Sequence, residues 1–186
     1  TPKHYTELEF PPLSEVSLPV YIRYELDNGM VVYLAEDRYL PLITGTAFIR
    51  TGSRIEPSDQ VGLAELTGTL MRTGGTKSHS PKELNFILEQ NAASIETGIG
   101  TTLGRGSFNT LTEDIDTVLP LFAEVLQEPA FDYLQLELAK NQQKGAIARR
   151  NDNPQDITGR EFKKLIYGAD SPYARTIEYE TLNNIS

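Results

Sequence analysis

The pattern of apolar and polar residues predicts a strand hairpin near the N-terminus. Residues 19–26 (PVYIRYEL) and 30–36 (MVVYLAE) are rich in β-branched and aromatic side chains, and Asp27-Asn28-Gly29 separates them. An Asn-Gly pair between two such runs is a strong hairpin signal, because both residues readily adopt the backbone angles of a tight turn. Residues 42–51 (LITGTAFIRT) predict a third strand.

Helical spacing of apolar residues then predicts two helices. The first begins around Ser58 or Asp59 and includes residues 61–76 (VGLAELTGTLMRTGGT). Its apolar stripe, which is predicted to face the core, consists of Leu63, Leu66 and Leu70. The second helix begins after Ser80, because the segment from Ser80 to Glu83 has the sequence of a capping box with proline at the first helical position. It is expected to run to about residue 91.

The second half of the chain predicts two more strands and three more helices. Residues 93–100 and 101–110 alternate as strands do, and their glycines indicate bulges or an edge that another backbone approaches closely. Thr112 is predicted to cap the next helix. The expected core residues of that helix are Ile115, Val118, Leu119, Phe122 and Val125. Further helices are predicted from Asp132 to about residue 150 and from Pro154 to Tyr167, with Gly168 as the C-cap of the last one.

The resulting order is three strands, two helices, two strands and three helices. Hairpin connections imply antiparallel strands, and helices grouped in runs pack on one face of a sheet. We therefore expect an α+β fold with a mostly antiparallel sheet of about five strands and helices on one face. Residues 1–18 carry three prolines and no periodicity, which predicts an irregular arm before a single domain over residues 19–186.

Composition narrows the partners and the chemistry. The net charge of −9 argues against a nucleic-acid or anionic-membrane partner, which would require a basic surface. No apolar run approaches the roughly 20 residues that cross a bilayer. The chain has no cysteine, and its two histidines, His4 and His79, lie in the arm and in a Gly/Ser-rich loop. A zinc site with two histidines would therefore need distant segments to converge. The compartment stays open between an exported and a cytoplasmic location.

The helix predicted over residues 61–76 has the spacing of a zinc-peptidase helix without its ligands. On such a helix, two histidines four residues apart and a glutamate beside them hold and use a catalytic zinc, in the arrangement H-x-x-E-H. Here the three positions read Glu65, Gly68 and Thr69. We expect the helix to keep a packing role without catalysis. Glu65 is interpreted as a solvated carboxylate, and the alternative is a remnant metal or substrate contact.

Several stretches, in order and spacing, together resemble the pitrilysin/insulinase family of zinc peptidases, which includes the processing peptidases. They are residues 26–36 (LDNGMVVYLAE), 48–76, 112–131, 149–154 (RRNDNP) and 166–175 (IYGADSPYAR). The resemblance covers the chain from about Tyr21 to its end. It implies zinc-binding histidines at positions 65 and 69, a general-base glutamate at position 68 and a glutamate ligand near Gly145 or Ala146. All four positions carry other residues, so the resemblance implies a non-catalytic member that holds no metal.

The resemblance also implies a partner and a path for a peptide. Subunits of the family contain two similar α+β domains, and pairs of subunits close around a peptide chamber. We therefore expect zinc only in a partner subunit or second domain, and we expect the present domain to be truncated at its C-terminal end. The family binds its peptide substrate along an edge strand. That strand falls on Ser94, Ile95, Glu96, Thr97, Gly98 and Ile99, and the alternative for these residues is a paired interior strand.

Three functions are compatible with this sequence. The first is a zinc-less domain, a pseudoenzyme, that helps to form a peptide-degrading chamber with a zinc-bearing partner. The second is an independent peptide-binding or scaffolding domain. The third is an active zinc peptidase with an atypical ligand set, built from Glu65 and carboxylates elsewhere in the chain.

Overall fold

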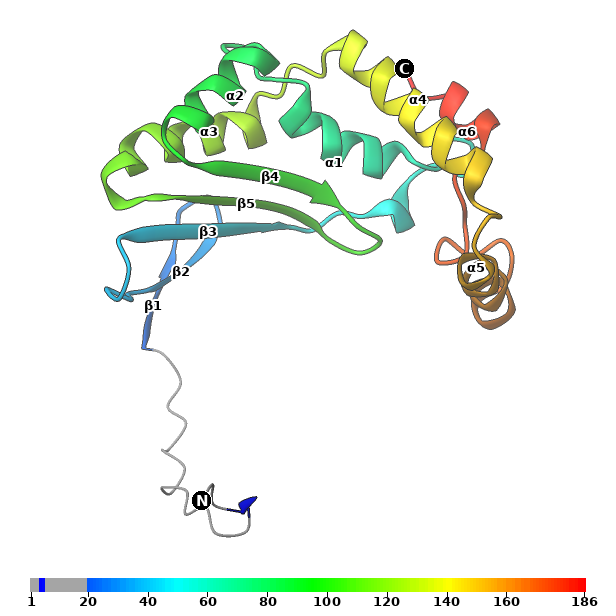
Figure 1. Cartoon of the computed structure of the whole chain (residues 1–186), viewed down its shortest axis with the longest axis horizontal. Coiled ribbons are helices and arrows are strands. Elements are labelled where there is room, and N and C mark those ends of the chain that lie inside the picture. The colour runs from blue at the N-terminus through cyan, green and yellow to red at the C-terminus, as the bar shows by residue number, and fades with distance from the viewer. Residues whose placement is uncertain (1–3, 6–19) are drawn as a thin grey trace. The chain divides into compact units, whose positions relative to one another are not determined.

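The computed structural model describes residues 4–5 and 20–186 (Figure 1). The chain divides into two compact units, one that ends at Leu40 and one that comprises Pro41–Ser186. The irregular arm predicted for residues 1–18 lies almost entirely outside the described residues. The two units are therefore considered one at a time.

The described part of the first unit is the predicted hairpin. Strands β1 (Tyr21–Glu25) and β2 (Val31–Ala35) pair antiparallel, with Tyr21 opposite Ala35. The amide of Gly29 donates to the carbonyl of Leu26 over 2.8 Å, and Gly29 has a φ of 82°. A positive φ at this position is why glycine follows asparagine here, and it confirms the turn predicted from the sequence.

The second unit contains a three-stranded antiparallel sheet. Its strands are β3 (Leu42–Ile49), β4 (Ser94–Ile99) and β5 (Gly104–Leu111), in the order β3-β5-β4. In register, Phe48 lies opposite Arg105, and Arg105 lies opposite Gly98. The α+β class and the antiparallel pairing are confirmed, but the five strands form two sheets instead of one.

Helices cover one face of the three-stranded sheet (Figure 1). Those that contact it are α1 (Leu63–Thr73), α2 (Pro81–Gln90) and α3 (Ile115–Gln127). Helix α4 (Tyr133–Arg149) packs against α1, and the short helix α6 (Tyr179–Asn183) packs against α4. Helix α5 (Pro154–Tyr167) has no buried residue. Single turns of 3₁₀ helix occupy Ser53–Ile55 (η2) and Thr112–Asp114 (η3).

Two apolar clusters hold these layers together. The first lies between the sheet and helices α2 and α3, and its buried members are Leu84, Leu88, Ile95, Phe108, Val118, Leu121, Phe122 and Val125. The second joins α1, α4 and the C-terminal segment through Leu66, Leu70, Leu136, Ala139, Ile147, Leu182 and Ile185. The stripe predicted on α1 is therefore a core stripe, although Leu63 is only partly buried.

Local signals placed several helix boundaries correctly. The capping box is present, with the Ser80 hydroxyl accepting from the Glu83 amide, and Asp132 caps α4 by accepting from the Gln135 amide. Helix α5 runs from Pro154 to Tyr167 with Gly168 as its C-cap, as predicted. Within the described residues, none of these helices is long and apolar enough to cross a membrane.

Three predictions about the helices were wrong. Helix α1 begins at Leu63, not around residue 58, because Gly62 has a φ of 106° and the Glu56 carboxylate accepts from the amides of Gly62 and Ala64. A glutamate six residues before Gly62 thus supplies the capping acceptor.

Helix α3 differs from the prediction in its start and in its buried face. A 3₁₀ turn separates Thr112 from the helix, and Thr112 makes no capping hydrogen bond to it. Leu119 is 47% exposed, whereas Leu121 is buried. Helix α6 was not predicted at all. It has only five residues, which are too few to show a helical period in the sequence.

Candidate functional site

Helix α1, which contains the positions that resemble a zinc-peptidase motif, exposes two of these positions and buries the third. Glu65 and Thr69 are exposed on α1, as four-residue spacing requires. Gly68, expected to lie beside them, is instead buried. The structure thus places Glu65 and Thr69, which the resemblance assigns to histidines, at the surface, and it turns position 68, which the resemblance assigns to the general base, toward the sheet.

Gly68 lies directly against the backbone of β4. A Cβ atom at residue 68 would be 2.4 Å from the amide nitrogen of Ile99 and 2.8 Å from the carbonyl carbon of Gly98. The hydroxyl of Thr97 donates to the carbonyl oxygen of Gly68 over 2.6 Å, which ties helix to strand at the same point. No side chain, and least of all a glutamate, fits at position 68 while this contact exists.

A hydrogen bond joins α1 to α4 where the resemblance implied shared zinc ligands. The amide of Gln143 on α4 donates to the Glu65 carboxylate on α1. Ala146, near the implied third ligand, lies on the same helix and is exposed. In the described part of the chain, no group of three or more His, Cys, Asp or Glu side chains is arranged to hold a metal ion. The donor set at positions 65, 68, 69 and 146 offers a single carboxylate, so these residues do not fit zinc.

β4 is an edge strand of the three-stranded sheet, and one backbone group on its free edge already accepts a hydrogen bond from a side chain. Arg72 on α1 donates through Nε to the carbonyl oxygen of Ile95 over 2.9 Å, so odd-numbered residues of β4 turn their backbone groups to this edge. Beyond the strand, the amides of Ser53 and Arg54 donate to the carbonyls of Gly100 and Thr101.

The backbone amide and carbonyl of Thr97 lie between the hydrogen bond to Ile95 and those to Gly100 and Thr101. No described residue hydrogen-bonds to them across the edge. Arg72 is half-buried, and burial lowers the pKa of its guanidinium, which the nearby Glu96 carboxylate partly opposes. The edge therefore has a short free stretch of backbone with a cation and an anion at one end.

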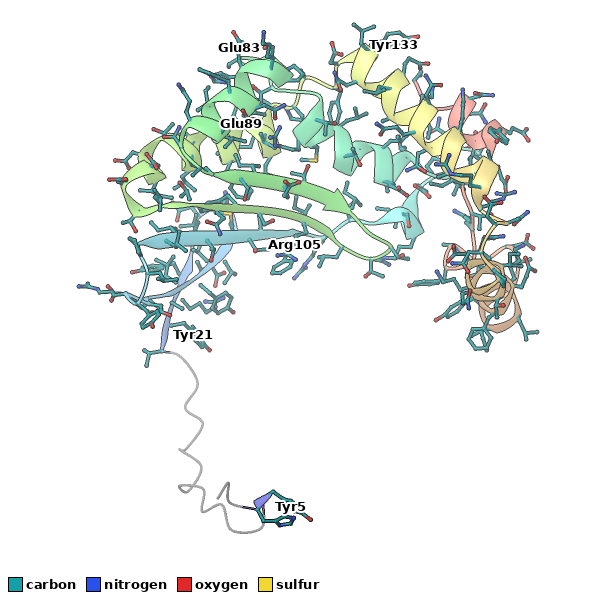
Figure 2. All side chains as sticks on the ribbon, viewed as in Figure 1. Tyr5, Tyr21, Glu83, Glu89, Arg105 and Tyr133 are labelled. Carbon is teal, nitrogen blue, oxygen red and sulfur yellow. The ribbon has the colours of Figure 1, made fainter. Side chains whose placement is uncertain are left out.

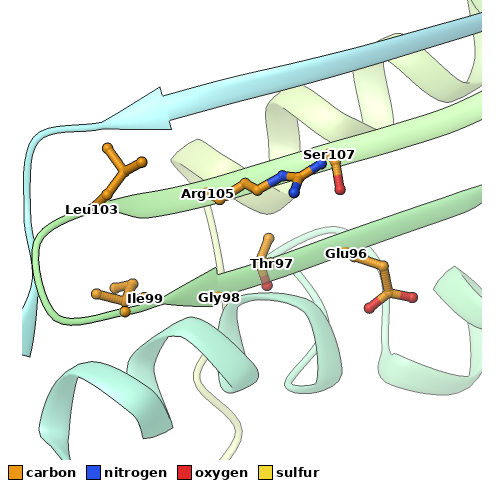
Figure 3. Close-up of a pocket in the computed structure, with 8 residues that line it drawn as sticks. Glu96, Thr97, Gly98, Ile99, Leu103, Arg105 and Ser107 are labelled. Atoms are coloured by element: carbon orange, nitrogen blue, oxygen red, sulfur yellow. The ribbon is translucent and has the colours of Figure 1, made fainter.

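The face of the sheet opposite the helices is open beside this edge. A shallow hollow of about 540 Å³ lies over β4 and β5 and is lined by Glu96, Thr97, Gly98, Ile99, Gly100, Leu103, Arg105 and Ser107 (Figure 3). Arg105 projects on the side away from the helices (Figure 2). The edge-strand residues and this hollow thus form one continuous surface.

Residues 32–177 match the insulinase family, peptidase family M16. The chain belongs to this family. A protein of Rickettsia felis described as an uncharacterized zinc protease is 24% identical over 155 residues, which cover 82% of the present chain and 37% of that protein. The chain therefore spans little more than a third of the length of this relative.

Two solved structures have the same fold as this chain. The inactive domain of a peptidase M16 from Pseudomonas fluorescens superposes with a TM-score of 0.78 at 23% identity, over 89% of this chain and 42% of that one. A protease from Helicobacter pylori superposes with a TM-score of 0.76 at 20% identity, over 91% of this chain and 41% of that one. At these identities the comparison establishes the fold of the M16 domain.

Three residues of the candidate site were not anticipated from the sequence. Arg72 and Gln143 tie α1 to β4 and α4, and Arg105 lines the hollow. Strand alternation alone predicts that Arg105 shares a face with Ser107, but which face is open depends on the helices. The contacts of Arg72 and Gln143 have no local signal, because each joins elements far apart in the chain.

Proposed function

We propose that this M16 domain is non-catalytic and helps to enclose a peptide chamber together with a zinc-bearing partner subunit or second domain. The observation that carries this proposal is the contact between Gly68 and β4, since backbone fills the position of the general base. Zinc is then needed only in the partner. The peptide would lie along Ser94–Ile99, where backbone hydrogen bonding does not depend on a catalytic site.

The exposed apolar side of α5 supports a partner domain or subunit. Leu165 is 81% exposed, Phe162 60% and Ile166 58%, and all three belong to one helix. Apolar side chains gathered at this level of exposure are typical of a surface that another protein or domain covers. An M16 domain that worked entirely alone would have no need of this surface.

The experiment is reconstitution with an M16 subunit that carries H-x-x-E-H and is encoded beside this protein. The mixture is expected to cleave a fluorogenic peptide that neither chain cleaves alone. Replacing the glutamate of the partner's motif should abolish the activity, whereas Glu65→Gln in the present chain should leave it unchanged. Stoichiometric zinc in this chain alone, with chelator-sensitive cleavage, would overturn the proposal and favour an atypical hydrolase.

An independent peptide-binding or scaffolding domain is the second candidate. It is favoured by one observation, the free backbone groups of Thr97 on the edge of β4, because strand addition there requires no partner. The two candidates differ in the reconstitution experiment. Binding of an extended peptide without any gain of cleavage in the mixture would favour the second.

A further inference from the structure

We propose that Arg105 selects the bound peptide by charge, pairing with an acidic side chain at the peptide position opposite Gly98. This inference rests on the proposed function, because it assumes that an extended peptide adds to the free edge of β4. It goes beyond that function by naming the residue that reads the peptide and the chemical class that it prefers.

Strand register places Arg105 in the correct row for this role. Phe48 on β3, Arg105 on β5 and Gly98 on β4 lie directly opposite one another across the sheet. A peptide strand added outside β4 would place one residue opposite Gly98, and its side chain would lie on the same open face. That residue would stand two strand spacings, roughly 10 Å, from the backbone of β5. An extended arginine and an extended acidic side chain bridge this span together.

Gly98 leaves the path between Arg105 and the edge clear. A Cβ atom at residue 98 would have no other atom within 4 Å, so nothing stands above this point of β4. On the other side, Phe48 offers an apolar ring that is 67% exposed and carries no carboxylate to pair with the charge. The guanidinium of Arg105, which Figure 3 shows extended along its own strand toward Ser107, therefore also has open space toward the edge.

Arg105 has no anionic partner within the domain. Among the ion pairs of the described residues none involves Arg105, although it is exposed on a chain with a net charge of −9. The nearest carboxylate by register is that of Glu96, which lies diagonally across from Arg105. Figure 3 shows the Glu96 side chain pointing away from Arg105, and Glu96 acts electrostatically on Arg72 instead.

The charges along this edge sum to a positive site. Arg72 and Arg105 are cations and Glu96 is an anion. The Glu96 carboxylate interacts electrostatically with Arg72, so the charge of Arg105 is left uncompensated. A peptide with an acidic side chain gains attraction from Arg105, whereas a basic side chain at the same position is repelled. Since the pair would be solvent-exposed, the expected preference is about two- to fivefold for an acidic over a neutral residue. It should weaken as ionic strength rises.

The test measures binding of three β-forming peptides to the full chain, identical except for a central Glu, Gln or Lys. The wild type is expected to bind them in the order Glu, Gln, Lys. Arg105→Gln should make the three equal, and Arg105→Glu should reverse the order. Lys163→Gln, which removes one positive charge from the exposed face of α5, is the matched control and should keep the wild-type order.

Each other outcome has a defined meaning. If all three peptides bind the wild type equally, Arg105 does not select by charge, although peptide binding at the edge stands. If the preference for Glu persists in Arg105→Gln, another group reads the charge and the assignment is wrong. If no peptide binds, edge binding itself is refuted. It is also refuted if a peptide with alternate N-methylated amides, which cannot add to a strand edge, binds as well as the unmodified peptide.

Discussion

Gly68 of α1 and Ile99 of β4 are in contact through their backbones, and a single added carbon at residue 68 would lie 2.4 Å from the Ile99 nitrogen. The resemblance assigns the general base to position 68, and this contact leaves no room there for a side chain. A glutamate introduced at residue 68 is therefore expected to push α1 away from β4 without creating catalysis.

The Gly68 contact predicts a stability effect for the smallest substitution. Gly68→Ala is expected to lower the free energy of unfolding by about 1–3 kcal/mol, since α1 must move away from β4 to admit the methyl group. Urea-induced unfolding measures this difference.

Gly159→Ala provides the matched control for Gly68→Ala. Gly159 lies within α5, and a Cβ atom there would have no neighbour within 4 Å. Alanine at that position is expected to stabilise the helix by up to about 1 kcal/mol. If Gly68→Ala behaved like Gly159→Ala, α1 would be free to move and the space beside β4 would be available.

The exposed positions 65 and 69 predict that zinc does not bind the wild-type chain there, but that a zinc site can be engineered at these positions. Zinc is expected to leave the melting temperature of the wild-type chain unchanged. Glu65→His combined with Thr69→His places two imidazoles four residues apart on the surface of α1, a spacing that suits zinc. The double variant should gain a melting temperature that rises with zinc and falls again with a chelator.

Peptide cleavage separates binding from catalysis in the same variant. The double variant should remain inactive, because Gly68 still stands where the resemblance places the general base. A zinc-dependent rise in the melting temperature of the wild-type chain would instead point to ligands outside the positions considered.

Leu182 predicts that the C-terminal segment belongs to the core of the second unit. Its side chain has no exposed surface and packs in the cluster with Leu66 and Leu136. Leu182→Ala is expected to lower the free energy of unfolding by about 2–5 kcal/mol. Leu165→Ala on α5 removes the same atoms from a side chain that is 81% exposed, and it should change the stability far less. Equal effects of the two substitutions would mean that α6 does not hold the α1–α4 layer.

Glu124 on α3 predicts a pH-dependent contribution to stability. Burial alone would raise the pKa of this carboxyl, but hydrogen bonds from the side chains of Thr76 and Ser78, with the charge of His79, bring the pKa below its ordinary value of 4.5. A carboxyl with a depressed pKa in the folded state stabilises the fold above its ordinary pKa, and this contribution disappears as the pH falls below that value.

Glu124→Gln is therefore expected to destabilise the wild-type fold by about 1–3 kcal/mol at neutral pH. The difference between the variant and the wild type should shrink as the pH falls below 4.5. Glu128→Gln, one helical turn further along, removes a carboxylate that makes no side-chain hydrogen bond to a described residue, and it serves as the control. If the difference in unfolding free energy between Glu124→Gln and the wild type stayed constant from neutral to acidic pH, the charge of the Glu124 carboxylate would not be what holds the loop of residues 76–79 to α3.

Local chemistry explains why much of the fold was predictable. The hairpin turn, the capping box at Ser80 and the glycine that ends α5 each depend on residues within a few positions of one another. The core face of α1 followed from helical spacing. That of α3 was misjudged, because Leu119 and Leu121 are equally apolar and the sheet decides which is buried.

The sequence by itself determined which residues stand at the four positions that the resemblance assigns to the zinc site, since residue identity needs no structure. Only the tertiary structure decided that Gly68 faces β4, that Gln143 meets Glu65 across 78 residues of chain, and that Arg105 lines an open hollow. These relationships join segments far apart in the chain, and they depend on how whole helices pack on the sheet. Side-chain preferences over a few residues carry no information about such packing.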